Sequence, residues 1–215
     1  MKQLIVINFK NYQEATGNNA LQLAKKLSKF NSQKYELVLV PSLLSLKEVK
    51  NNFNKQVFSP HVDNITYGSY TAGINVQELK QFGVNGTLLN HSECKLPYDV
   101  LKNTINLCKR FKIKTIVCAS KLREIKKIAQ LSPTYIAYEP KELIGGTVSV
   151  TSAQPHLITK AIEIINGKSK FLCGAGIHSK EDVGQAILLG SDGVLIGHAI
   201  SKAKDPLKKL KEMLI

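Results

Sequence analysis

Short apolar runs alternate with amphipathic stretches along this sequence, and the alternation restricts the possible folds more than any other feature. The runs are rich in Val and Ile and are nearly continuous in apolar character, which is typical of strands buried on both faces. We predict eight strands, at residues 4–9, 36–40, 57–61, 86–90, 114–119, 134–138, 170–173 and 193–196.

A stretch with helical spacing follows each predicted strand. The clearest three cover residues 20–30, 101–111 and 183–189. Gly17 stands at the start of the first, Pro97 near the start of the second, and Gly190 at the end of the third, where these residue types favour helix boundaries. The strict order of strand and helix predicts parallel strands joined by right-handed crossovers.

Two α/β architectures fit this order, an open doubly wound sheet and a closed (β/α)8 barrel. Eight units without a ninth strand favour the parallel eight-stranded barrel. The 215 residues leave about 27 residues for each unit, which is compact for this fold. We therefore expect residues 1–215 to form a single barrel domain.

The formal net charge of +14, from 30 basic and 16 acidic side chains, raises the possibility of a nucleic-acid partner. Such a module needs a concentrated basic stripe with interleaved aromatic residues. Here the cations are spread over predicted helices, at residues 25, 26 and 29, 109–114, 121–127 and 208–211. We expect solvated helix faces and no nucleic-acid binding, although the charge can attract an anionic substrate at low salt.

Membrane, secretion and metal signals are missing from the sequence. No apolar stretch approaches the roughly 20 residues that a membrane span needs, and the N-terminal run is too short for a secretion signal. The cysteines at 94, 108, 118 and 173 form no Cys-x-x-Cys pair and have no His at zinc-ligand spacing. We expect a cytoplasmic protein with reduced, mostly buried thiols and no metal site.

Ionisable residues and glycines cluster where the predicted strands end. Lys10, His91 and Glu139 close three of the strands, and turns containing Gly174, Gly176, Gly197 and His198 follow the last two. Each has an ordinary structural explanation, as a solvated flank, a cap, a rim carboxylate or a turn residue. Because the carboxyl ends of barrel strands meet at one rim, their coincidence predicts a functional site there.

The residue types indicate a chemistry. Glycine turns after strands seven and eight, each opening a helix, would present backbone N–H groups to a phosphate. A carboxylate opposite an imidazole and a cation suits proton abstraction next to a carbonyl, with the developing enediolate stabilised by the other two groups. This chemistry needs no cofactor.

Four motifs at these strand ends resemble those of triosephosphate isomerase, in the short form found in archaea: Asn8-Phe9-Lys10, Asn90-His91-Ser92-Glu93, Tyr138-Glu139-Pro140 with Ile144-Gly145, and Cys173-Gly174-Ala175-Gly176. They occur in the family's order across nearly the whole chain. The resemblance implies a TIM barrel that interconverts dihydroxyacetone phosphate and glyceraldehyde 3-phosphate in glycolysis and gluconeogenesis.

By this resemblance Glu139 is the proton acceptor and His91 the neutral electrophile at a helix start. Lys10 supplies positive charge, and Glu93 supports the site. Residues 140–147 would form a mobile lid. The substrate would be bound by Asn8, Phe9, Lys10 and the backbone N–H groups of Ile144, Gly145, Gly176, Gly197 and His198.

The resemblance also implies an assembly. Thr71 lies in Gly68-Ser69-Tyr70-Thr71, which is similar to a loop that reaches a neighbouring subunit and braces Asn8 and Lys10. We expect a homo-oligomer, either a dimer or a tetramer.

The sequence departs from the family at three places. Gly146-Thr147 reverses the usual Thr-Gly order, Cys94 replaces a common basic residue, and His198 occupies a position usually held by Gly or Ser. We favour a backbone role for His198 and predict none for His61, His156 or His178.

A second interpretation is another phosphate-binding barrel enzyme, such as an aldolase or an isomerase of tryptophan synthesis. An aldolase requires a Schiff-base lysine within the barrel, and only Lys10, at the rim, is available.

Overall fold

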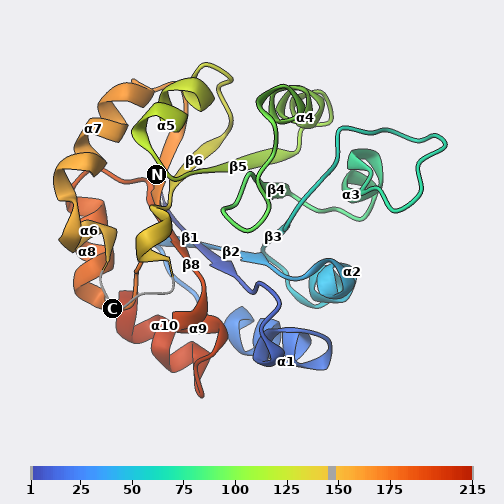
Figure 1. Ribbon diagram of the computed structural model, residues 1–215. Helices are drawn as coiled ribbons and strands as arrows, with labels where there is room; N and C mark the ends of the chain where they lie inside the picture. Colours follow the sequence, from blue (N-terminus) through green and yellow to red (C-terminus); the bar gives the residue numbers. More distant parts are fainter. Residues whose placement is uncertain (1, 145–148, 215) are drawn as a thin grey trace.

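Eight parallel strands close into a barrel in which each strand pairs with the next and β8 pairs with β1. The structure is a computed structural model that describes residues 2–144 and 149–214, and Figure 1 shows its helices surrounding the strands. The strands are β1 (Gln3–Asn8), β2 (Tyr35–Val40), β3 (Gln56–Ser59), β4 (Gly86–Leu89), β5 (Lys114–Ala119), β6 (Tyr135–Tyr138), β7 (Lys170–Cys173) and β8 (Gly193–Ile196). The predicted (β/α)8 barrel is confirmed.

Helices connect successive strands over the outside of the barrel. They are η1 (Gln13–Ala15), α1 (Asn18–Ser28), α2 (Leu43–Asn52), α3 (Val76–Gln81), α4 (Tyr98–Arg110), α5 (Leu122–Ala129), η2 (Lys141–Leu143), α6 (Val150–Ala153), α7 (Pro155–Ile165), α8 (Lys180–Leu188), α9 (His198–Ser201) and α10 (Pro206–Leu214). Gly17 and Pro97 are the N-cap residues of α1 and α4, and Gly190 follows the C-cap of α8, as the sequence predicts.

Alternate strand residues divide the core into two layers, because side chains point to opposite faces of a strand. The inner layer fills the barrel with Leu4, Val6, Val38, Val40, Phe58, Leu88, Ile116, Cys118, Tyr135, Ala137, Leu172 and Leu195. The outer layer packs the remaining strand residues against the helices. This double burial explains the nearly continuous apolar runs in the sequence.

Closure of the barrel depends on a close approach between its first and last strands. Gly193 lies opposite Leu4 in the β8–β1 pairing. A Cβ atom at Gly193 would lie 2.0 Å from the Leu4 carbonyl oxygen, much too close for any side chain. A glycine at this position therefore lets β8 reach β1.

The connection from β3 to α3 is long compared with the other connections between a strand and the helix that follows it. The strand ends at Ser59 rather than at residue 61, and the chain runs through residues 60–75 before α3, which has only 6 residues. This connection projects beyond α3 (Figure 1). His61 and the backbone N–H of Ile74 bind the two carboxylate oxygens of Asp63, at 3.1 and 2.8 Å, and so tie the two ends of the connection together.

Candidate active site

The residues predicted from the strand ends do come together at one rim of the barrel. Asn8 is the last residue of β1, Glu139 follows β6, and Gly197 follows β8. One small cavity is lined by Asn8, Lys10, Glu139, Ile144, Gly174, Gly176, Gly197 and His198, among others. His91 and Glu93 line an adjoining hollow that also includes Asn8 and Lys10.

The backbone of Lys10 is held in an unusual conformation. Its φ angle is +51°, in the left-handed region, and its N–H donates to Oδ1 of Asn8 at 3.1 Å. Its ammonium group lies 2.6 Å from a carboxylate oxygen of Glu93. A left-handed non-glycine residue costs free energy that the surrounding structure must supply. Asn8 and Glu93 therefore hold the Lys10 charge at the rim.

His91 is buried, and its surroundings determine which ring nitrogen carries the proton. The backbone N–H of Glu93 donates to Nδ1 of His91 at 3.2 Å. A ring nitrogen that accepts a hydrogen bond carries no proton, so this contact favours the neutral tautomer protonated at Nε2. The ring can then donate a hydrogen bond from Nε2 to a substrate oxygen.

The expectation that His91 begins a helix is wrong. The residue lies in a turn in which the Cys94 N–H donates to the His91 carbonyl at 2.9 Å, and α4 begins only at Tyr98. Pro97 explains the delay, since a proline disfavours helical geometry in the residue before it. The neutral tautomer is thus favoured by the hydrogen bond from Glu93 and not by a helix dipole.

Glu139 faces His91 across the site. Its Oε2 lies 3.7 Å from Nε2 of His91, and the two residues are 4% and 6% exposed. Neither atom has a hydrogen-bond partner within the described part of the chain. Buried polar atoms without partners are rare, and where they occur in an enzyme they are candidates for contact with substrate.

Burial is the main influence on the Glu139 carboxyl. It raises the pKa of Glu139 above its usual value, although a hydrogen bond from Cys118 and the charge of Lys10 act in the opposite direction. Burial likewise raises the pKa of the Cys118 thiol, which therefore stays protonated and donates to Glu139. A carboxyl group with a raised pKa is a better proton acceptor near neutral pH.

Gly174 creates the space that Glu139 occupies. A Cβ atom at position 174 would lie 2.5 Å from Cγ and 3.0 Å from Cδ of Glu139. The backbone N–H of Gly174 donates to the Tyr138 carbonyl at 3.0 Å, which continues the β6–β7 pairing up to the site. The sequence marks Gly174 only as a turn residue, because nothing in it records this contact with β6.

The two glycine turns lie side by side, since β7 and β8 are neighbours. Gly176 has a φ of +68°, and Gly197 is the N-cap residue of α9. Only the second turn opens a helix directly, and that helix has 4 residues. The expectation that the first also does so is wrong, because Ser179 and Asp182 form a capping box that starts α8 at Lys180.

Two histidines flank these turns. The rings of His178 and His198 lie 4.8 Å apart, and both residues line the cavity with Lys10 and Glu139. Burial lowers the pKa of His198 from its usual value, and the nearby charges of His178, Lys202 and Lys10 lower it further. Sequence reasoning predicts no role for His178, because its pairing with His198 arises only when β7 and β8 come together.

Three other predicted site residues, Phe9, Thr71 and Gly145, do not present a side chain to the cavity in the described part of the structure. The Phe9 side chain is fully buried in the outer core, so only its main chain is available to a substrate. Thr71 is exposed in the connection after β3. Gly145, and with it the Gly146-Thr147 reversal, lies outside the described residues, whereas Ile144 lines the cavity.

Residues 2–144 and 149–214 contain no group of three or more His, Cys, Asp or Glu side chains that could hold a metal ion. Over the same residues no helix is long and apolar enough to cross a membrane. Cys108, Cys118 and Cys173 are buried free thiols, as expected, whereas Cys94 is exposed.

Comparison with known proteins gives one consistent result. A sequence model of the triosephosphate isomerase family matches residues 3–213. The triosephosphate isomerase of Methanocaldococcus jannaschii is 39% identical, and that of Thermoplasma volcanium 36% identical, each over 98% of both chains. The triosephosphate isomerase of Methanobrevibacter smithii is 35% identical over 98% of this chain and 97% of its own.

Proposed function

This chain belongs to the triosephosphate isomerase family, and we propose that Glu139 and His91 perform the family's reaction at the rim of its barrel. The protein is an aldose–ketose isomerase that interconverts dihydroxyacetone phosphate and D-glyceraldehyde 3-phosphate, a step of glycolysis. We extend this role to gluconeogenesis, because the interconversion runs in both directions. The chemistry requires no cofactor.

The observation that carries the proposal is a facing pair of buried atoms, Nε2 of His91 and Oε2 of Glu139. They lie 3.7 Å apart, and neither has a hydrogen-bond partner among residues 2–144 and 149–214. The Glu139 carboxylate takes a proton from the carbon next to the carbonyl, while the Nε2–H of His91 donates to the carbonyl oxygen. The resulting enediolate receives the proton back on the neighbouring carbon. No atom is gained or lost, as an isomerisation requires.

The remaining predicted residues have supporting roles. We infer that Lys10, positioned by Asn8 and Glu93, attracts the negative charge that develops on the substrate oxygens. The phosphate is held by N–H groups of Gly176, Gly197 and His198, with Ile144 and Gly145 contributing from the lid. The position of the second turn beside Lys10 supports this assignment, since a Cβ atom added at Gly197 would lie 3.7 Å from Cε of Lys10.

Replacement of the base tests the proposal. Glu139→Gln keeps the shape of the side chain but cannot accept the proton, so we expect kcat to fall by about 10²- to 10⁴-fold in a coupled isomerase assay. Glu163→Gln is the matched control, since it removes the same charge from an exposed side chain on α7 that lines neither cavity of the site. A Glu139→Gln enzyme that retains the wild-type rate would contradict the assignment.

We also propose that the chain forms a homo-oligomer, a dimer or a tetramer. Leu44 is fully exposed and Leu43 is 44% exposed, and both line the hollow beside the site, which has a volume of about 760 Å³. Tyr67 and Tyr70 are exposed in the connection after β3, which also carries Thr71. The insertion of this connection into the hollow of a second copy would bury both apolar sets and bring Thr71 toward Asn8 and Lys10.

Two broader expectations complete the proposal. We infer a single barrel domain over residues 1–215, because all eight strands belong to one closed sheet. We also infer a cytoplasmic protein, in which the three buried cysteines remain reduced.

A further inference from the structure

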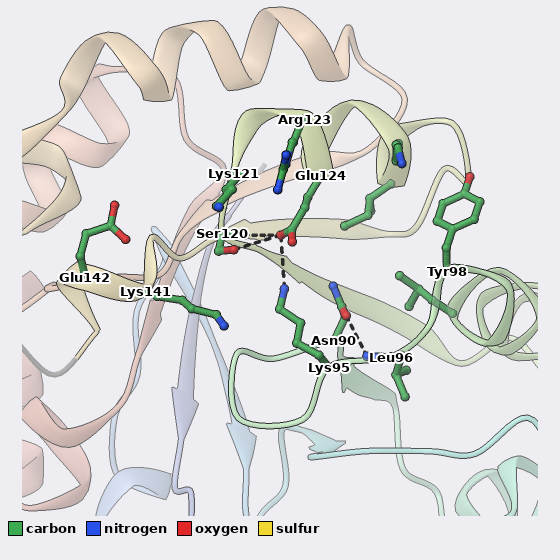
Figure 2. Close-up of a pocket in the computed structure, with 13 residues that line it drawn as sticks. Asn90, Lys95, Leu96, Tyr98, Ser120, Lys121, Arg123, Glu124, Lys141 and Glu142 are labelled. Carbon is green, nitrogen blue, oxygen red and sulfur yellow. Dashed lines mark hydrogen bonds and ion pairs between the residues drawn. The ribbon is translucent and has the colours of Figure 1, made fainter.

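A separate cavity lies on the outside of the barrel, between α4, α5 and the start of the connection after β6 (Figure 2). We call it the α4–α5 groove. Its volume is about 650 Å³, which is within the range of small-molecule sites. It is lined by Asn90, Lys95, Leu96, Tyr98, Leu101, Ser120, Lys121, Arg123, Glu124, Lys127, Ile128, Lys141 and Glu142.

Basic side chains from three separate segments surround this groove. Lys95 comes from the turn after β4, Lys121, Arg123 and Lys127 from α5 and its N-cap, and Lys141 from η2. The acidic lining consists of Glu124 and Glu142 only. Figure 2 shows the Lys141 side chain extending from η2 toward Lys95, with Glu142 at the end of the groove away from Tyr98.

Glu124 is already engaged by the protein through Oε2, one of its two carboxylate oxygens. Its carboxylate accepts from the backbone N–H and the hydroxyl of Ser120, at 2.7 and 3.2 Å, and lies 3.3 Å from the ammonium of Lys95. These contacts lower the pKa of Glu124 even though burial acts in the opposite direction. Glu124 therefore neutralises Lys95 and leaves Glu142 as the remaining carboxylate of the lining, opposite the other cations of the groove.

The four remaining cations are unpaired. Across the described residues, Lys121, Arg123, Lys127 and Lys141 take part in no ion pair. Like charges that converge on a concave surface repel one another and attract multivalent anions. Four cations opposite Glu142 alone favour a ligand with several negative charges rather than a simple monoanion.

The rest of the lining is suited to an uncharged, flat group. Leu101 and Ile128 are buried and Leu96 is half-buried, so together they form an apolar floor. Tyr98 is 41% exposed at the rim, where its ring is available for stacking. Asn90 binds the Cys118 carbonyl and the Leu96 N–H through its two amide atoms, which fixes the wall of the groove.

We propose that the α4–α5 groove is a binding site for a nucleoside polyphosphate, with the phosphates on the α5 and η2 cations and the base over Tyr98 and the apolar floor. The proposal goes beyond isomerisation and does not depend on it. Arginine and lysine bind phosphate oxygens through charge-assisted hydrogen bonds, and a purine has the size and flatness that the aromatic rim accepts.

Binding of ATP to the purified protein, measured by titration calorimetry, tests the proposal. The titration is made with glycerol 3-phosphate at saturation, so that the barrel rim is occupied and cannot account for the signal. We expect a Kd of about 0.1 mM or tighter at moderate salt. Absence of ATP binding under these conditions, or displacement of ATP by glycerol 3-phosphate, overturns the proposal.

A matched pair of triple variants separates the groove from general surface charge. Lys121→Ala, Arg123→Ala and Lys127→Ala together should weaken ATP binding at least about tenfold. Lys25→Ala, Lys26→Ala and Lys29→Ala remove the same charge from the exposed face of α1 and should change the Kd less than about twofold. Equal losses in the two variants would mean that ATP binds to the basic surface in general, which overturns the site.

The nucleoside part has its own test. Tyr98→Ser should weaken ATP binding several-fold while leaving the binding of inorganic tripolyphosphate unchanged, because only ATP carries a base to stack. If ATP binds no more tightly than tripolyphosphate, and Tyr98→Ser changes neither, the nucleoside polyphosphate is the wrong ligand class.

Discussion

At the scale of single residues, Gly174 determines where the Glu139 carboxylate lies. Gly174→Ala would place a methyl group 2.5 Å from Cγ of Glu139, so the side chain of the base has to move. Displacement of a catalytic group by about 1 Å can cost roughly 100-fold in rate. We expect kcat to fall by about 10- to 100-fold while KM changes little, measured in the coupled assay.

Gly184→Ala provides the control for this substitution. It adds the same methyl group in α8, where the methyl meets nothing within 4 Å apart from its chain neighbours and the backbone of its own helix. Alanine also favours a helix over glycine. Activity should be unchanged and the protein slightly more stable. A Gly174→Ala enzyme with the wild-type kcat would show that the Glu139 side chain moves without loss of activity. The close contact between position 174 and Glu139 would then have no effect on catalysis.

We predict that the side chain of His198, which lines the cavity, makes substrate binding depend on pH in addition to the role of its backbone N–H. In the free protein its pKa is lowered by burial and by His178, Lys202 and Lys10, so the ring is mainly neutral at pH 7. A bound phosphate dianion has the opposite effect and raises the pKa, so substrate binding takes up a proton. As the pH falls from about 8 to about 6.5, KM should therefore decrease before protonation of the phosphate itself intervenes.

His198→Ser removes this contribution. We expect KM to rise about threefold at pH 6.5 and less at pH 8, with kcat nearly constant, in assays at fixed ionic strength. His156→Gln, on the exposed side of α7, is the control and should preserve the wild-type pH profile. If His198→Ser and the wild type share one KM profile, His198 contributes through its backbone alone.

Lys10, His91 and Glu139 could be predicted from the sequence because each follows an apolar run, and the ends of parallel barrel strands necessarily meet. The cause of the neutral His91 ring could not be predicted, since it depends on a backbone N–H of Glu93 that turns back onto the ring. The Gly174 contact with Glu139 likewise requires the β6–β7 register. No spacing within either segment reveals these contacts between segments.

At the scale of elements, the β7–α8 connection is held by its capping box. The Ser179 hydroxyl accepts from the Asp182 N–H at 3.1 Å, while Asp182 accepts from the N–H groups of Ser179 and His178 at 3.0 and 2.9 Å. Burial acts to raise the pKa of Asp182, but hydrogen bonds from Ser149, His178 and Ser179 outweigh it and lower the pKa. The box thus fixes His178 beside the cavity as well as starting the helix.

Ser179→Ala should lower the free energy of unfolding by about 1 kcal/mol, the usual cost of losing an N-cap side chain. In a chain of this size that corresponds to a decrease in Tm of about 2–4 °C. Ser28→Ala, which removes a hydroxyl at the end of α1, is the control and should leave Tm nearly unchanged. Thermal unfolding followed by circular dichroism measures both, and an equal Tm for Ser179→Ala and the wild type would exclude a stabilising cap.

At the scale of the whole molecule, the barrel leaves one apolar region exposed close to its own site. Leu44 at the start of α2 borders the same hollow as Lys10 and His91. A lone exposed leucine is common in monomers, but an exposed leucine pair facing a large hollow, with two exposed tyrosines on a projecting connection, is typical of an interface. Assembly and catalysis should therefore depend on each other.

Leu44→Asp places a charge in the centre of the proposed interface and should convert the proposed oligomer to monomer in sedimentation velocity experiments. Because the same hollow includes Lys10 and His91, the monomer should also lose at least about tenfold in kcat as the rim loses its support. Leu188→Asp, 79% exposed on α8 and outside both cavities of the site, introduces the same charge and should change neither property. A Leu44→Asp protein that sediments like the wild type would place the interface elsewhere. A monomer with full activity would show that the barrel needs no second copy.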